Sequence, residues 1–153
     1  MSHSTPPDVI RNIERIDPEL VARAAQYPSS ILADVAGRRG ALSSRIAPLA
    51  PSMRLAGPAV TVEVRPGDNL MIHAAMAIAR PGDVLVIDGK GDESCALMGE
   101  IMVSQCMAMG IAGIVVYGLW RTDLFGQWGA RGGDRKSTRL NSSHVKRSRM
   151  PSS

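Results

Sequence analysis

The sequence predicts an α/β fold with a largely parallel central sheet, and three observations support this. Strand-like and helix-like segments alternate along the chain, which is typical of parallel sheets joined by crossover helices. The runs VLVI and GIVVY are continuously apolar, as expected for strands buried on both faces. Gly- and Pro-containing turns separate the segments. With 153 residues, 44% of them apolar, the chain is long enough for one domain with a substantial core.

The N-terminal third predicts three short helices. Asp8 is placed to cap the first, Pro18 favours the first turn of the second, and Ser29 or Ser30 caps the third, which Gly37 ends. The expected helices span residues 9–16, 18–26 and 29–36.

The middle of the chain predicts the sheet. The expected order is strand 57–64, helix 69–79, strand 84–87, helix 95–109 and strand 113–117. A right-handed crossover through the second of these helices places the last two strands side by side.

Charge divides the chain into two parts. Residues 134–153 hold six basic side chains and one acidic one, whereas residues 1–133 hold 12 basic and 13 acidic ones. The tail lacks helical or strand periodicity, and residues 134–144 back-translate to a common sequencing adapter. We therefore predict a near-neutral domain over 1–133, truncated at its C-terminus, and a non-native, disordered tail over 134–153. The alternative is a disordered basic tail that binds nucleic acid or membrane.

Several other classes are disfavoured. Residues 1–7 lack the features of a signal peptide and no run approaches ~18 apolar residues, so we expect a cytoplasmic protein without a membrane partner. Five aromatic residues make an RNA-stacking surface improbable, and the loop around Lys90 lacks a phosphate-binding motif. Cys95 and Cys106 lack a metal-ligand spacing and are expected to be buried thiols.

Candidate site residues follow two of the predicted strands. Open α/β sheets bind ligands beyond the carboxyl ends of their strands. Gly99 would let an anion approach backbone N–H groups near a helix start, Arg121 could bind a carboxylate through a bidentate fork, and Glu100 could accept a proton or orient water at a metal. The alternatives are structural: helix packing for Gly99, a solvated carboxylate for Glu100 and a surface ion pair for Arg121.

Three further features have mainly structural interpretations. His73 is expected to be a packed or capping histidine, and Trp120 to line a pocket or contact another subunit. A group of apolar side chains is expected in the core, namely Leu97, Met98, Met102, Met107 and Met109.

The runs GPAVTV, PGDNLMIH, PGDVLVIDGKGDESCALMGEIM and GIAGIVVYGLWR resemble the RraA-like family. This family includes 4-hydroxy-4-methyl-2-oxoglutarate aldolases and the regulator of ribonuclease activity A. The resemblance covers roughly residues 31–121. The family pattern is an acidic residue, twenty residues and then Arg-Asp, and Glu100 to Arg121 has this spacing.

The resemblance implies a layered α/β/α domain of the swivelling type and a pyruvate site. Backbone amides of the segment Gly99, Glu100, Ile101 and Met102 would bind pyruvate, Arg121 would hold its oxygens, and Glu100 would orient water at a Mg²⁺ or Mn²⁺ ion. The residue after the Arg contacts that ion in the family. It is Thr122 here, which lacks a carboxylate, and Asp123 is a weak substitute.

The implied function is a metal-dependent aldolase that cleaves 4-hydroxy-4-methyl-2-oxoglutarate-type oxoacids to pyruvate, with oxaloacetate decarboxylase side activity. The family assembles as trimers or hexamers, and a neighbour's C-terminal segment completes some sites, so we expect this truncated chain to be inactive. The alternative is a non-catalytic binding protein like the ribonuclease regulator. Residues 116–118 and Thr122 resemble that branch, whereas residues 92–102 resemble the aldolases.

Overall fold

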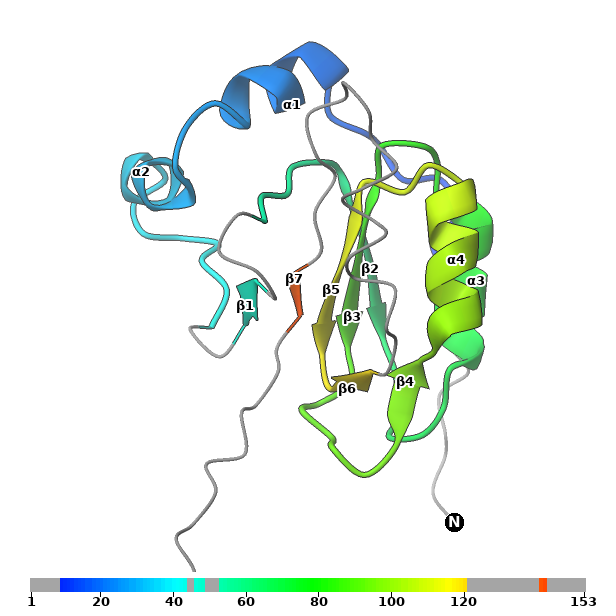
Figure 1. The fold of residues 1–153 in the computed structure, drawn as a ribbon. Helices are drawn as coiled ribbons and strands as arrows, with labels where there is room; N and C mark the ends of the chain where they lie inside the picture. The colour runs from blue at the N-terminus through cyan, green and yellow to red at the C-terminus, as the bar shows by residue number, and fades with distance from the viewer. Residues whose placement is uncertain (1–8, 44–45, 49–52, 121–140, 143–153) are drawn as a thin grey trace, which may run out of the picture.

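The computed structural model describes residues 9–43, 46–48, 53–120 and 141–142, which form an α/β fold (Figure 1). Strands β2 (Ala59–Glu63), β3 (Val84–Asp88) and β5 (Gly113–Tyr117) lie side by side and parallel, with β3 in the middle. Helix α3 (Leu70–Ile78) connects β2 to β3, and α4 (Glu100–Ala108) lies between β3 and β5 along the chain. The predicted fold class and the adjacency of the last two strands are confirmed.

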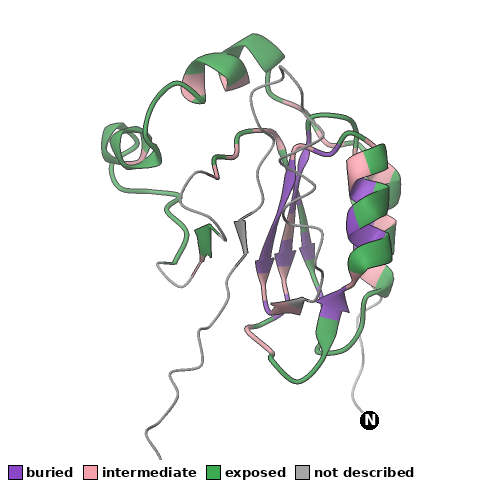
Figure 2. Cartoon of the chain, in the orientation of Figure 1, coloured by how far each residue is buried: buried purple, intermediate pink, exposed green. Residues whose placement is uncertain are grey.

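Helices α3 and α4 cover one face of this sheet, and the main core lies between them and the strands (Figures 1 and 2). Side chains at alternate strand positions point to this face, as the two-residue period of a strand requires. Val60, Leu85 and Ile114 form one row across the three strands and are almost fully buried. On the opposite face β2 is exposed, because its alternate residues have no covering element among the described residues.

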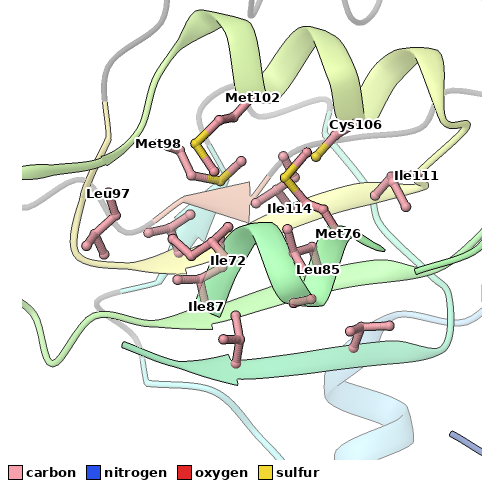
Figure 3. Packing of buried hydrophobic residues seen from close by; sticks show 14 of the residues in the cluster. Ile72, Met76, Leu85, Ile87, Leu97, Met98, Met102, Cys106, Ile111 and Ile114 are labelled. Carbon is pink, nitrogen blue, oxygen red and sulfur yellow. The ribbon is translucent and has the colours of Figure 1, made fainter. Parts of the chain in front are cut away.

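Sulfur-containing side chains fill the space between the helices and the sheet (Figure 3). Met76, Met98, Met102 and Cys106 are buried there, and Met107 and Met109 pack against the margin of the same cluster. Unbranched methionines fill irregular gaps well. The prediction that the methionine-rich segment belongs to the core is confirmed.

The predicted helix over 95–109 is partly wrong, because its first residues form a strand. Strand β4 (Ala96–Met98) pairs in parallel with β6 (Leu119–Trp120), and α4 begins only at Glu100. A short apolar run cannot be assigned to strand or helix by periodicity alone. The early strand leaves Cys95 exposed, so the expected burial of this thiol is also wrong, whereas Cys106 is buried as predicted.

Two of the three predicted N-terminal helices form. Helix α1 (Pro18–Ala24) is capped by the carboxylate of Asp17, and α2 (Ser29–Val35) has Pro28 rather than a serine at its cap position. The helix predicted over 9–16 is wrong, because residues 9–16 have no regular secondary structure. Ile13 packs against the core instead.

An ion pair fixes this N-terminal segment to the amino edge of the sheet. The Arg15 guanidinium donates to both carboxylate oxygens of Asp83 at 2.8–3.1 Å and to the carbonyl oxygen of Ile78 at 3.0 Å. Asp83 is 1% exposed and also accepts the backbone N–H of Arg80 at 2.8 Å. Burial alone would raise the pKa of Asp83, but the hydrogen bonds from Arg15 and Arg80 outweigh burial, so this pKa lies below its usual value. These tertiary contacts replace the local helix that the sequence favoured.

Part of the predicted tail forms a strand. Within residues 134–153 the structure describes β7 (Asn141–Ser142), which pairs in parallel with β5 and antiparallel with β1 (Ala47–Pro48). The expectation of a tail without strands is wrong for these two residues. The other residues of 134–153 lie outside the described part, and their non-native origin stays a prediction. Among the described residues, no helix has the length and apolar character needed to cross a bilayer.

Candidate active site

The carboxyl ends of β2, β3 and β5 meet at one edge of the sheet, together with the start of α4 and the short strands β4 and β6 (Figure 1). This is the edge at which the sequence placed the candidate site. Parallel strands deliver their following loops to the same edge, so residues after β3 and after β5 come together although they are far apart in the sequence.

The start of α4 is open to a ligand. Gly99 occupies the cap position in an extended conformation, and no side chain in the described part of the chain caps the helix. A methyl group added at Gly99 would meet no atom of residues 9–43, 46–48 and 53–120 within 4 Å, so these residues do not support the alternative explanation that Gly99 permits close helix packing. The unpaired N–H groups and the positive end of the helix dipole favour an anion at such a position.

The residues of the Gly99–Met102 segment differ in the exposure of their side chains. The side chains of Glu100 and Ile101 are exposed, the latter by 78%. The side chain of Met102 is 6% exposed and packs in the core, so only its backbone is available to a ligand. The segment therefore offers backbone N–H donors and the Glu100 carboxylate to a ligand, while the buried side chain of Met102 fixes it to the core.

Arg121, Thr122 and Asp123 lie outside the described residues, and their roles stay predictions. The described chain does reach the residue before Arg121. In the β4–β6 pair, Trp120 is the partner of Met98, which lies two residues before Glu100. The main chain that leads to Arg121 therefore runs beside the strand that leads to the candidate carboxylate.

A divalent cation would find few protein ligands in this part of the structure. The described residues contain no group of three or more His, Cys, Asp or Glu side chains that could hold a metal ion. The exposed carboxylate of Glu100 is one suitable oxygen ligand. Mg²⁺ typically keeps several waters and takes one or two protein carboxylates besides substrate oxygens. Within the Gly99–Met102 segment, the Glu100 carboxylate is the side chain that could contact such a cation.

Lys90 is the basic residue nearest in sequence to the Gly99–Met102 segment, and its ammonium group forms ion pairs with two carboxylates. Its ammonium lies 2.6 Å from Glu63 and 3.3 Å from Asp88, two residues that are cross-strand partners at the ends of β2 and β3. The hydrogen bond that Lys90 donates to Glu63 is the main cause that raises the pKa of Lys90. Lys90 is therefore engaged on the sheet face opposite the helices, away from the core side.

Asn69 is a neighbour of the site that sequence reasoning missed. It precedes α3, where it resembles an ordinary helix cap, yet its side chain does not cap that helix. Asp68 accepts the Leu70 N–H instead, and the Asn69 amide donates to the sulfur of Met102 at 3.9 Å. Of the two roles predicted for His73, packed or capping, the packed role is wrong because His73, one turn further along α3, is exposed. The sequence does carry a signal for this contact. Asp68 and Asn69 both precede α3, and when Asp68 accepts the helix N–H, the side chain of Asn69 is left to make another contact.

Sequence comparison identifies the family. The family model described as aldolase/RraA, of the RraA-like proteins, matches residues 19–123. The chain belongs to the RraA-like family. This match includes all but the first residue of α1, all of α2, the parallel strands β2, β3 and β5, and the segments that carry Glu100 and Arg121.

Curated relatives bear the name of the aldolase. A protein of Halalkalibacterium halodurans named "Putative 4-hydroxy-4-methyl-2-oxoglutarate aldolase" is 39% identical over 103 residues, which cover 67% of this chain and 49% of the relative. A protein of Arabidopsis thaliana with the same name, numbered 2, is 45% identical over 65 residues, 42% of this chain and 39% of its own. The chain spans about half the length, or less, of these relatives.

Solved structures share the fold. The RNA-processing inhibitor RraA of Thermus thermophilis has a TM-score of 0.59 at 25% identity, over 76% of this chain and 66% of its own. An unusual RraA-family member of Streptomyces coelicolor, from the family of RNase ES inhibitors, has a TM-score of 0.69 at 25% identity, over 86% and 65%. The relatives thus include both proteins named as aldolases and proteins named as ribonuclease inhibitors.

Proposed function

We propose that this protein is a divalent-metal-dependent aldolase that cleaves 4-hydroxy-4-methyl-2-oxoglutarate-type oxoacids to pyruvate, with oxaloacetate decarboxylation as a side activity. The observation that carries the proposal is the uncapped, sterically open start of α4 at the carboxyl edge, in a chain whose curated relatives are named as this aldolase. Pyruvate is a small anion, and its carboxylate suits exposed N–H groups at a helix start.

The proposed chemistry needs electrons to be drawn toward the keto oxygen. Arg121 would hold the pyruvyl oxygens through its planar fork and stabilise the negative charge that develops on the enolate. A bound Mg²⁺ or Mn²⁺ would act as a Lewis acid at the same oxygens. Glu100, with Thr122 or Asp123 where the family has a carboxylate, would hold that cation through water.

Bond cleavage then follows the usual course of a retro-aldol reaction. The substrate hydroxyl loses its proton to water ordered by the exposed Glu100 carboxylate. The adjacent carbon–carbon bond breaks, one oxoacid leaves, and the electron pair forms the pyruvate enolate. A proton returned to the enolate carbon yields pyruvate. With oxaloacetate the same enolate forms when carbon dioxide leaves.

A second candidate function is a non-catalytic binding protein of the ribonuclease-regulator type. It is favoured by the structural likeness to the RNA-processing inhibitor and by Thr122, which lacks the carboxylate of the aldolases. In that case the open start of α4 would be an inherited feature without a substrate.

Pyruvate release distinguishes the two functions. The assay uses the 153-residue chain and a full-length protein that carries residues 1–133, each with Mg²⁺ or Mn²⁺. The aldolase proposal expects turnover in the longer protein, a gain in the Thr122→Asp variant, and a loss on the order of 100- to 1000-fold in Arg121→Ala, because a transition-state charge donor is removed. Arg121→Lys should not restore activity, since it lacks the fork. No activity in either the parent or Thr122→Asp would reject the aldolase.

We further propose that the protein works as a cytoplasmic homotrimer or hexamer without nucleic-acid or membrane partners. Helices α1 and α2 support the assembly. Each has seven residues and none of them is buried, and Leu20, Ile31 and Val35 are exposed. Helices of this length are marginal without packing. Sedimentation of the parent and of Ile31→Asp tests the assembly. A parent that sediments as a monomer would contradict it.

A further inference from the structure

The side chain of Leu97 fills a socket made by two glycines at the carboxyl edge. Leu97 belongs to β4 and is fully buried. A methyl group added at Gly89 would overlap the Cδ1 atom of Leu97, and one added at Gly118 would lie 2.9 Å from the same atom. Gly89 follows β3 and Gly118 follows β5, so one leucine methyl group occupies the space that both glycines leave empty.

Hydrogen bonds join the same segments around the socket. The N–H groups of Gly89 and Gly91 donate to the carbonyl oxygen of Tyr117, at 2.9 and 3.2 Å. The N–H of Leu119 donates to the carbonyl oxygen of Asp92 at 2.9 Å. The loop after β3 is thereby attached to the end of β5, directly before β6.

The socket lies between the two arms of the candidate site. Two residues after Leu97, Gly99 begins the turn into α4. One residue after Gly118, Leu119 begins β6, which is paired with β4. A shift of Leu97 would therefore change where the N–H groups of α4 stand relative to the chain that follows Gly118.

We propose that Gly89 and Gly118 are positioning residues, whose missing side chains let Leu97 set the start of α4 against β6. The inference rests on the proposed function and deepens it. It also gives a role to the Gly-rich loop after β3, which phosphate binding did not explain. Neither glycine has a left-handed backbone, so the space and not the dihedral angles requires glycine here.

The two glycines should respond differently to a compensating change. In Gly118→Ala the new methyl group clashes with Leu97 alone, and its next neighbours stand at 3.6 Å. Leu97→Val removes the clashing atom, so the double variant Gly118→Ala/Leu97→Val should regain the parent's position of the α4 start. In Gly89→Ala the methyl group also stands 3.0 Å from the Tyr117 carbonyl oxygen, so the same compensation should be incomplete.

The test measures backbone amide resonances and oxalate binding, with oxalate as a mimic of the pyruvate enolate. It compares the parent, Gly118→Ala, Gly89→Ala, Leu97→Val and the two double variants. Ile114→Val is the control, because Ile114 is a fully buried core residue of β5 and loses one methylene group as Leu97 does. Val103, whose N–H donates to the Gly99 carbonyl oxygen at 3.1 Å, reports on the first turn of α4 by its hydrogen exchange.

Gly118→Ala should shift the amide resonances of residues 100–103, speed the exchange of Val103 and weaken oxalate binding on the order of tenfold. Adding Leu97→Val should restore all three, whereas Ile114→Val should leave them unchanged. Unchanged resonances in Gly118→Ala, or no recovery in its double variant, would overturn the inference. If the parent fails to bind oxalate, the proposed function is in question, while the resonances and the exchange still decide the role of the socket.

Discussion

The two edges of the parallel sheet are built in opposite ways. At the amino edge, Arg15 and Asp83 form a nearly buried ion pair whose hydrogen bonds also engage backbone groups of the neighbouring segments. At the carboxyl edge, no side chain among the described residues caps α4, Glu100 is exposed, and a methyl group added at Gly99 would meet no described atom within 4 Å. One edge has its polar groups satisfied within the chain, and the other leaves them available.

This contrast separates stability from chemistry within one small domain. A satisfied buried polar network holds its segments in place, and removing one partner leaves the other desolvated and unpaired. An open helix start has the reverse property, because its N–H groups gain a partner only when a ligand arrives. Variants at the amino edge should therefore change folding, and variants at the carboxyl edge should change turnover.

Among the residues that the structure describes, the largest effect is expected at Glu100. Glu100→Gln removes the proposed proton acceptor and should lower kcat by about 100-fold, while the thermal midpoint stays unchanged because the side chain is exposed. Steady-state pyruvate release and thermal unfolding measure the two quantities. Glu93→Gln, another exposed acid on the same edge, is the control and should keep full activity. Equal losses of kcat in Glu100→Gln and Glu93→Gln would contradict a specific role of Glu100 as the proton acceptor.

The converse variant is Asp83→Asn. It leaves Arg15 without its carboxylate and should lower the free energy of unfolding by about 1–3 kcal/mol, with kcat unchanged. Urea denaturation followed by circular dichroism gives the free energy. If the midpoint is unaltered, or if turnover falls while stability holds, the amino edge does not have the role assigned to it.

Low pH should remove the stabilisation by the Arg15–Asp83 ion pair in the parent protein. The folded-state pKa of Asp83 lies below its usual 3.8, so its stabilising effect is complete above that value and disappears as the pH falls through the lower folded value. The difference in unfolding free energy between the parent and Asp83→Asn should stay constant at neutral pH and shrink below about pH 4. A difference in unfolding free energy that grows as the pH falls would contradict the lowered pKa of Asp83.

The smallest contrast concerns the two thiols. Cys95 is exposed beside β4, whereas Cys106 is buried on α4 and burial raises its pKa to about 11. A thiol reagent at pH 8 should label Cys95 quickly and Cys106 only after denaturation. Peptide mapping of the labelled chain decides this. Native labelling at Cys106 would show that the helix layer opens more readily than the packing implies.

Much of the sheet and its covering helices was predictable because their signals are local. The strands at 84–88 and 113–117 carry continuous apolar runs, and the helix at 70–78 lies between two Pro-Gly turns. The order of these segments determined the fold class, and the spacing from Glu100 to Arg121 pointed to the family. These features depend on residue type and separation along the chain, which the sequence states directly.

The rest was decided by contacts between residues far apart in sequence. Residues 9–16 favour a helix locally, but Arg15 is held in place by Asp83, 68 positions away. Leu97 lies in a segment predicted to be helical, but its neighbours Ala96 and Met98 pair with β6, and its two glycines follow β3 and β5. The sequence by itself determined the α/β architecture and the place of the open edge. Only the tertiary structure decided which edge is closed and where α4 starts, because burial and ion pairing outweigh local propensity once distant segments meet.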